Sequence, residues 1–214
     1  MKTPVFICGT SNFNLPIVYA YSMLRLKNNW NSYGLVAILL HWLIAVGLVA
    51  LFTSGLWMTT LDYYHPWYNG APSLHISFGV VVTMLVLLRI FWSFFSHSPQ
   101  HLAGRVSMLL AQTMHVLLHL LPLLIAVSGY LMVTAEGQGA AVFSLFELPP
   151  LLEAASERAD ITGIFHLWLA WSLMILTLAH AVAAVYHHIV LHDAVLVRMF
   201  GYNSPPEGEK NENN

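Results

Sequence analysis

Histidine is the residue type in this chain with the most chemistry to offer. The 214 residues include 12 histidines, which outnumber the 10 aspartates and glutamates together. An imidazole can ligate a metal ion or a haem iron, and it can carry protons near neutral pH. Six of the histidines lie inside long apolar stretches, where a polar group is costly and usually functional. They are His41, His75, His115, His119, His166 and His180.

The composition indicates that the stretches around these histidines are membrane-spanning helices. Hydrophobic residues make up 57% of the chain and charged residues only 8%, whereas a soluble domain has about 25% charged residues. Four apolar runs each exceed the roughly 20 residues that a helix needs to cross the hydrocarbon core. They are Gly34–Met58, Leu74–Phe95, Ser107–Val133 and Gly163–Leu191. We therefore predict an all-α fold, a four-helix transmembrane bundle, since open strands cannot lie in lipid.

The same composition excludes several classes of protein. A net charge of −2, with only eight lysines and arginines, does not fit a nucleic-acid binder, so lipid rather than nucleic acid is the expected partner. The single cysteine, Cys8, excludes disulfide frameworks, iron–sulfur clusters and cysteine-rich zinc sites.

The sequence divides into three parts. Residues 1–30 form an N-terminal extension. Its first 22 residues resemble neither a signal peptide nor a helix, and we expect them to be a start-site artefact, with Met23 as the true beginning. Residues 31–201 form the transmembrane domain, whose long outer loop at 135–162 contains an apolar run, Phe143–Leu148, expected to form a small amphipathic cap. Residues 202–214 are expected to be a disordered polar tail.

Basic residues predict the orientation of the spans. Arginines and lysines gather before the first span, between the second and third, and after the fourth. The other two loops hold six acidic residues and a single arginine, Arg158. The positive-inside rule then places both termini in the cytoplasm.

With this orientation, four histidines fall into two pairs at different depths. His166 and His180 are 14 residues apart, which puts both imidazoles on one face of the fourth helix, about 21 Å apart along its axis. His41 lies near the inner side on the first helix, and His75 lies near the outer side on the second. We therefore predict two stacked bis-histidine sites, His41 with His180 and His75 with His166.

Paired imidazoles without nearby carboxylates or thiolates favour haem over other metal centres. Zinc prefers four ligands and di-iron sites need several glutamates, but these spans contain essentially no acids. Haem iron needs only two axial ligands, because the porphyrin supplies the other four. The predicted metal ligands are thus the four paired histidines, with one haem per pair. Since the chain has no C-x-x-C-H motif, both haems would be non-covalent and b-type.

Other polar residues keep more than one interpretation. His115 could compete for His180, and with His119 it could instead contact substrate or a haem propionate, or pack in the core. His187 lies two turns beyond His180 on the same face and could handle protons, line a quinone site or serve as an axial ligand. Arg89 could pair with a haem propionate or a quinone oxygen, or extend to the membrane interface.

These motifs resemble those of the bacterial cytochrome b561 family, which are four-helix, di-haem inner-membrane proteins. The resemblance covers roughly Tyr33 to Gly201 and rests mainly on the spaced histidines. The matching segments are Leu40-His41-Trp42, Leu74-His75-Ile76-Ser77-Phe78-Gly79, Phe165-His166, His180 with His187-His188, and the closing stretch His192–Met199.

The resemblance implies that His41, His75, His166 and His180 are the haem ligands, in agreement with the depth argument. It also implies one-electron transfer in a respiratory chain of the inner membrane, with ubiquinone as substrate and His187 as a catalytic residue of a cytoplasmic-side quinone site. One activity of characterised relatives is superoxide:ubiquinone oxidoreduction. The acidic outer loops are unsuited to steering an anion, and they suggest instead a docking surface for a periplasmic partner.

Two other functions remain open at this point. A haem-bearing anchor subunit of a larger dehydrogenase would use the same ligands. A metal transporter with intramembrane histidines would be expected to carry Asp or Glu in its spans, and these helices offer almost none.

Overall fold

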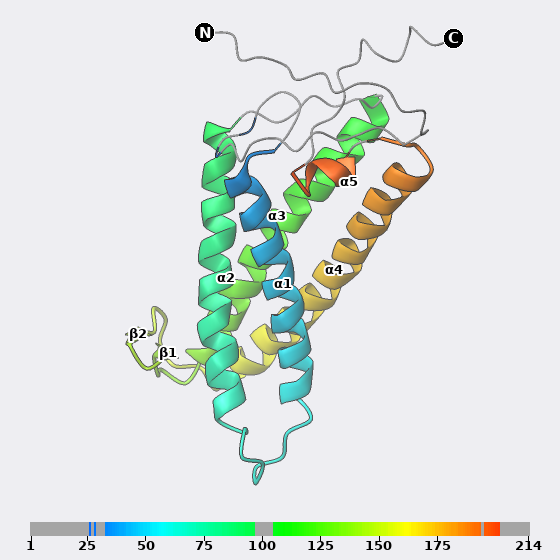
Figure 1. The fold of residues 1–214 in the computed structure, drawn as a ribbon. Coiled ribbons are helices and arrows are strands. Elements are labelled where there is room, and N and C mark those ends of the chain that lie inside the picture. The colour runs from blue at the N-terminus through cyan, green and yellow to red at the C-terminus, as the bar shows by residue number, and fades with distance from the viewer. Residues whose placement is uncertain (1–25, 27, 29–32, 97–104, 194, 202–214) are drawn as a thin grey trace, which may run out of the picture.

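The computed structural model describes residues 26, 28, 33–96, 105–193 and 195–201, and this part of the chain is mostly helical (Figure 1). The expected start at Met23, the N-terminal extension and the polar tail lie wholly or largely outside these residues. The elements are α1 (Leu35–Met58), α2 (Gly70–Phe95), α3 (Arg105–Val133), β1 (Ala140–Val142), β2 (Phe146–Leu148), α4 (Ser156–Ile189) and α5 (Val195–Arg198).

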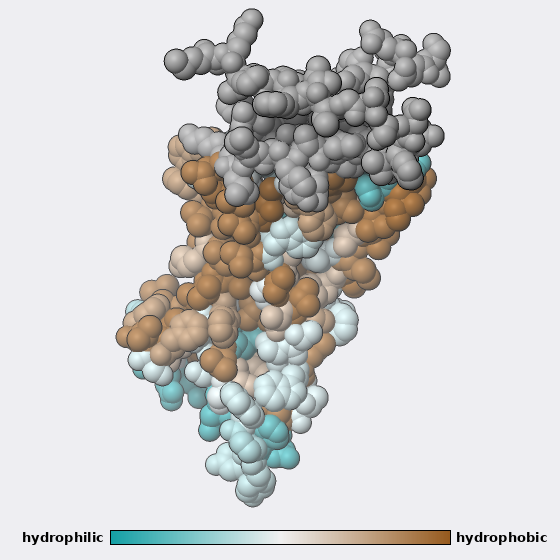
Figure 2. Space-filling model, viewed as in Figure 1, coloured by the Kyte–Doolittle hydropathy of each residue, from teal (hydrophilic) through white to brown (hydrophobic). Residues whose placement is uncertain are grey.

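The four long helices confirm the predicted transmembrane bundle. Each is long and apolar enough to cross a membrane. Many of their large apolar side chains face outward, and Phe94 and Trp168 are 81% and 68% exposed. Figure 2 shows this hydrophobic surface over the helices, with hydrophilic residues gathered at the end that carries the α1–α2 loop. Lipid can cover such a surface, because the backbone N–H and C=O groups within each helix are hydrogen-bonded to one another rather than exposed to lipid.

Two helices begin a full turn or more before the position that the hydropathy pattern predicts. α2 begins at Gly70 rather than Leu74, and α4 begins at Ser156 rather than Gly163. The first turns of α4 contain a glutamate and an arginine, which favour a helix without being apolar. Hydropathy therefore marks only the part of the helix that lies in lipid.

The long helices run antiparallel, and successive helices pack against one another. Gly47 lets α1 approach α2, since a Cβ added there would lie 2.7 Å from Val82 Cγ2. α3 packs closely along α4, whereas α1 and α4 have few contacts. In Figure 1, α4 leans away from α1 toward the end that carries α5. We call this the α5-end of the bundle, and the opposite end, where the α1–α2 loop lies, the β-end.

The α3–α4 connection forms a β-hairpin that lies beside α2 near the β-end (Figure 1). Its turn residues Phe143 and Ser144 have positive φ angles of 48° and 57°. The Phe143 N–H donates a hydrogen bond of 2.8 Å to Ser77 Oγ, which attaches the turn to α2. The run expected to form an amphipathic cap is thus a small hairpin, and it leaves Leu145 and Phe146 exposed.

Candidate functional site

Four histidines come together as two pairs, one toward each end of the bundle. The rings of His75 on α2 and His166 on α4 have centroids 6.3 Å apart, and we call them the β-end pair. The rings of His41 on α1 and His180 on α4 have centroids 6.4 Å apart, and we call them the α5-end pair. All four residues are half-buried. α4 therefore contributes one imidazole to each pair.

The ring spacing in both pairs suits two imidazoles on opposite sides of one metal ion. A metal–imidazole bond is about 2.0 Å and the ligating nitrogen lies about 1.15 Å from the ring centroid, so two rings in line have centroids about 6.3 Å apart. The described residues contain no group of three or more His, Cys, Asp or Glu that could hold a metal ion. The pairs thus fit a group that brings its own remaining ligands, as haem does.

Serines on α1 and α3 hold the rings of the β-end pair. Ser54 Oγ lies 3.1 Å from His75 Nδ1, and Ser128 Oγ lies 3.2 Å from His166 Nδ1. Each hydroxyl donates its hydrogen to the carbonyl oxygen three residues earlier, at 3.0 and 2.9 Å. Each serine oxygen is therefore left to accept from an imidazole N–H, which places the proton on Nδ1 and leaves Nε2 to ligate.

A glycine next to each serine gives the imidazole room. A Cβ added at Gly129 would lie 3.0 Å from His166 Cε1, and one added at Gly55 would lie 3.3 Å from His75 Cε1. Both distances are shorter than an ordinary van der Waals contact. The two rings therefore lie against helix backbone, at positions that we call the glycine seats, where an added methyl group would force the ring to shift by a few tenths of an ångström.

These seats were not predicted, although the sequence carries a signal for them. Ser54 lies 13 positions after His41 in α1, and Ser128 lies 13 positions after His115 in α3. The same His-x12-Ser-Gly spacing thus occurs in both helices. A search for repeats between the two halves of the chain would have found it.

The α5-end pair has different surroundings. In the described part of the chain, no hydrogen bond reaches a ring nitrogen of His41 or His180. Arg89 of α2 lies close by, because its Nη1 donates a hydrogen bond of 3.1 Å to the carbonyl oxygen of Ala37, one helical turn before His41. The α5-end pair therefore lies near a guanidinium cation, whereas the β-end pair is in contact with serine hydroxyl oxygens.

His115 brings a third imidazole to the α5-end pair, since its ring centroid lies 5.4 Å from that of His180. This is shorter than the spacing of about 6.3 Å for two rings across one ion. A porphyrin also needs width between the helices that ligate it, and α1 and α4 have few contacts whereas α3 and α4 pack closely. Both observations favour His41 as the partner of His180. His119 Nδ1 contacts the His115 carbonyl oxygen within its own helix, at 2.5 Å.

Beyond the α5-end pair, a carboxylate holds His187. His187 Nδ1 lies 2.5 Å from Asp193 Oδ2. The other carboxylate oxygen of Asp193 accepts a hydrogen bond of 3.1 Å from the N–H of Val195, where α5 begins. Asp193 thus fixes one nitrogen of the imidazole and leaves the other, Nε2, for a ligand or a proton.

The segment around α5 is in contact with the first half of α1. Trp42 Nε1 donates a hydrogen bond of 3.1 Å to the Met199 carbonyl oxygen. Burial raises the pKa of the Tyr33 phenol, while the positive charges of Arg198 and Arg89 act to lower it. Two guanidinium groups therefore lie near one phenol at the α5-end.

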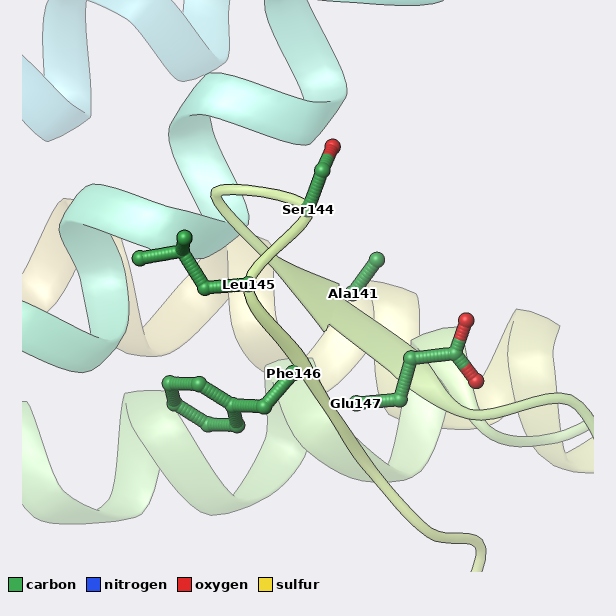
Figure 3. A pocket seen from close by; sticks show the side chains of 5 residues that line it. All are labelled: Ala141, Ser144, Leu145, Phe146 and Glu147. Atoms are coloured by element: carbon green, nitrogen blue, oxygen red, sulfur yellow. The ribbon is translucent and has the colours of Figure 1, made fainter.

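An open hollow on the β-hairpin is separate from the histidine pairs. Figure 3 shows its lining residues, Ala141, Ser144, Leu145, Phe146 and Glu147, whose side chains point apart. One carboxylate and one hydroxyl that do not converge offer no catalytic arrangement.

Four membrane-spanning helices with an imidazole pair toward each end define a helical membrane protein of the cytochrome type. The sequence model of the family described as "Prokaryotic cytochrome b561" matches residues 32–202, and the chain belongs to this family. Membership implies a b-type haem and a role in electron transport, and it identifies the chain as a bacterial membrane protein. The resemblance drawn from the histidine motifs is confirmed.

Two curated relatives support the same family. "Cytochrome b561 homolog 2" of Escherichia coli (strain K12) is 39% identical over 183 residues, which cover 85% of this chain and 97% of that protein. "Probable superoxide oxidase CybB" of Yersinia pestis is 28% identical over 171 residues, which cover 78% of this chain and 95% of that protein.

Proposed function

We propose that this protein is a di-haem cytochrome that passes single electrons across the inner membrane between a periplasmic or membrane partner and the quinone pool. The observation that carries the proposal is the pair of imidazoles at each end of the bundle, with ring centroids 6.3 and 6.4 Å apart. His75 and His166 would hold one haem, and His41 and His180 the other. Haem with two histidine ligands has no open coordination position, so the chemistry it supplies is electron transfer.

The α5-end faces the cytoplasm in this proposal, together with both termini. The β-end faces the periplasm. The support is the distribution of charge, since the α1–α2 and α3–α4 connections and the first turns of α4 hold six acidic residues and one arginine.

His187 is the residue that we assign to the quinone. One quinone becomes one quinol by taking up two electrons and two protons, and an imidazole can pass protons near neutral pH. The contact with Asp193 holds one ring nitrogen at 2.5 Å, so the other remains available to a quinone oxygen. Ubiquinone is the substrate that we expect.

The electron source on the periplasmic side is either superoxide or a redox partner. The relative named as a probable superoxide oxidase supports the first. The single arginine there, Arg158, supports the second source, because its Nη2 is already engaged with the backbone carbonyl oxygens of Glu153 and Ala135, at 2.7 and 3.4 Å. The surrounding acids would attract a cationic partner.

The test begins with the purified full chain, expressed with sufficient haem. A pyridine haemochrome assay should give two b haems per chain, and the reduced-minus-oxidised spectrum should show sharp low-spin bands. A chain without haem would overturn the proposal, and one haem per chain would show that one pair is misassigned.

A second experiment tests the quinone site. A ubiquinol analogue should reduce the haems of the wild-type protein rapidly, and His187→Ala should slow this step while both haems stay bound. Superoxide supplied in place of the quinol decides between the two electron sources. Co-purification of a soluble oxidoreductase would instead favour an anchor subunit.

A further inference from the structure

We infer that side chains around the two histidine pairs set the direction of electron flow, from the β-end to the α5-end. Ser54 and Ser128 would lower the reduction potential at the β-end pair, and Arg89 would raise it at the α5-end pair. This inference rests on the proposed function, because it takes one haem to be bound at each pair.

The β-end pair is surrounded by groups that favour the oxidised, ferric form. The Ser54 oxygen accepts from His75 Nδ1, and His166 Nδ1 donates to both the Ser128 oxygen and the Ile125 carbonyl oxygen, the latter at 2.9 Å. An acceptor on Nδ1 makes an imidazole a more basic ligand and so stabilises the higher oxidation state.

Charge acts in the same direction at this end. The only acids in the four long helices are Glu157 and Asp160, both in the first turns of α4 at the β-end, and with Arg158 between them these turns carry a net charge of −1. Negative charge near an iron favours its more positive, ferric form, and the effect is strong where the dielectric constant is low.

The α5-end pair has the opposite environment. No acceptor reaches the ring nitrogens of His41 or His180 within the described residues. The Arg89 guanidinium is fixed one turn from His41 by its hydrogen bond to the Ala37 carbonyl oxygen. A nearby cation opposes a further positive charge on the iron and therefore favours the ferrous form. Electrons that enter at the β-end would thus move toward the α5-end, where His187 lies.

The first test compares two single-haem variants of the full chain. His75→Ala should keep only the α5-end haem, and His41→Ala should keep only the β-end haem. Redox titration, followed by the visible absorbance of the haem, should give the higher midpoint potential for His75→Ala. The reverse order, or equal potentials, would overturn the inferred direction.

The second test changes the tuning residues in the otherwise wild-type protein. Ser54→Ala and Ser128→Ala should each raise the lower of the two potentials, and Arg89→Gln should lower the higher one. We expect each change to alter the ferrous-to-ferric ratio at fixed ambient potential about tenfold, which is about 59 mV for a one-electron couple. Arg89→Lys should restore the higher potential, because it restores the charge.

A matched control distinguishes a specific effect on the reduction potentials from a general effect of removing a serine. Ser93 in α2 also donates to the carbonyl oxygen three residues earlier, at 2.7 Å, and no histidine among the described residues is hydrogen-bonded to it. Ser93→Ala should leave both potentials unchanged. Unmoved potentials in the Ser54, Ser128 and Arg89 variants, with two haems still bound, would overturn the assigned roles. A wild-type protein with fewer than two haems would instead overturn the proposed function.

Discussion

The two histidine pairs have nearly the same ring spacing, yet different elements hold them. At the β-end, hydroxyl oxygens from α1 and α3 and two glycine seats fix the rings of His75 and His166. At the α5-end, His41 and His180 have no such partners in the described residues, and a cation and a third imidazole lie beside them. Two histidine pairs of the same geometry could therefore serve two purposes, because the groups that contact them differ.

The largest expected effect comes from removing one ligand of either pair. His166→Ala should abolish haem binding at the β-end and His180→Ala at the α5-end, because a lone imidazole leaves the iron one axial ligand short. The pyridine haemochrome assay should fall from two haems per chain to one in each variant. Two retained haems in either variant would show that its pair is wrongly assigned.

The glycine seats allow a sharper distinction between the two ends. Gly129→Ala would place a methyl group 3.0 Å from His166 Cε1, and Gly55→Ala would place one 3.3 Å from His75 Cε1. Both should disturb the β-end haem only, with Gly129→Ala the more severe. Low-temperature haem spectra should show one altered and one unchanged set of bands.

Gly79 provides the matched control, since a Cβ there would meet nothing within 4 Å. Gly79→Ala should bind two haems with wild-type spectra. Equal damage from all three substitutions would mean that loss of glycine itself, rather than contact with the rings, is responsible.

His115→Ala decides which imidazole is the partner of His180. Because the His41 spacing of 6.4 Å suits axial ligation better than the His115 spacing of 5.4 Å, the variant should keep two low-spin haems. Its spectrum is expected to shift slightly, through loss of a ring beside the ligand. A fall to one haem would reverse the assignment of His41 and His115.

The smallest effect is expected at the contact that closes the α5-end. Trp42→Phe removes the hydrogen bond to the Met199 carbonyl oxygen and keeps a ring against Phe200, now 5.2 Å away between centroids. The free energy of unfolding should fall by about 0.5–1.5 kcal/mol, measured by thermal unfolding in detergent. Haem content should not change, and its loss would show that this contact supports the α5-end pair.

The sequence predicted the four spans well, because apolar length is enough to mark a helix in lipid. The proximity of His166 to His75 and of His180 to His41 could also be anticipated, since spacing on α4 and the direction of each helix determine depth. The His-x12-Ser-Gly repeat could have marked Ser54 and Ser128 as candidates, but not their contacts with the imidazoles, because these depend on how α1 and α3 are rotated about their axes. The β-hairpin was missed for a related reason, as its turn is held by a contact with Ser77, 66 residues away in the sequence.

The position of α4 in the chain has a consequence for biosynthesis. His166 and His180 are both on this helix, which follows the other three spans in order of synthesis. Three helices are therefore synthesised before either pair can be completed. Cofactor loading would then follow the insertion of α4 rather than accompany translation, and a ribosome that stalls before this helix would leave an empty three-span fragment for quality-control proteases.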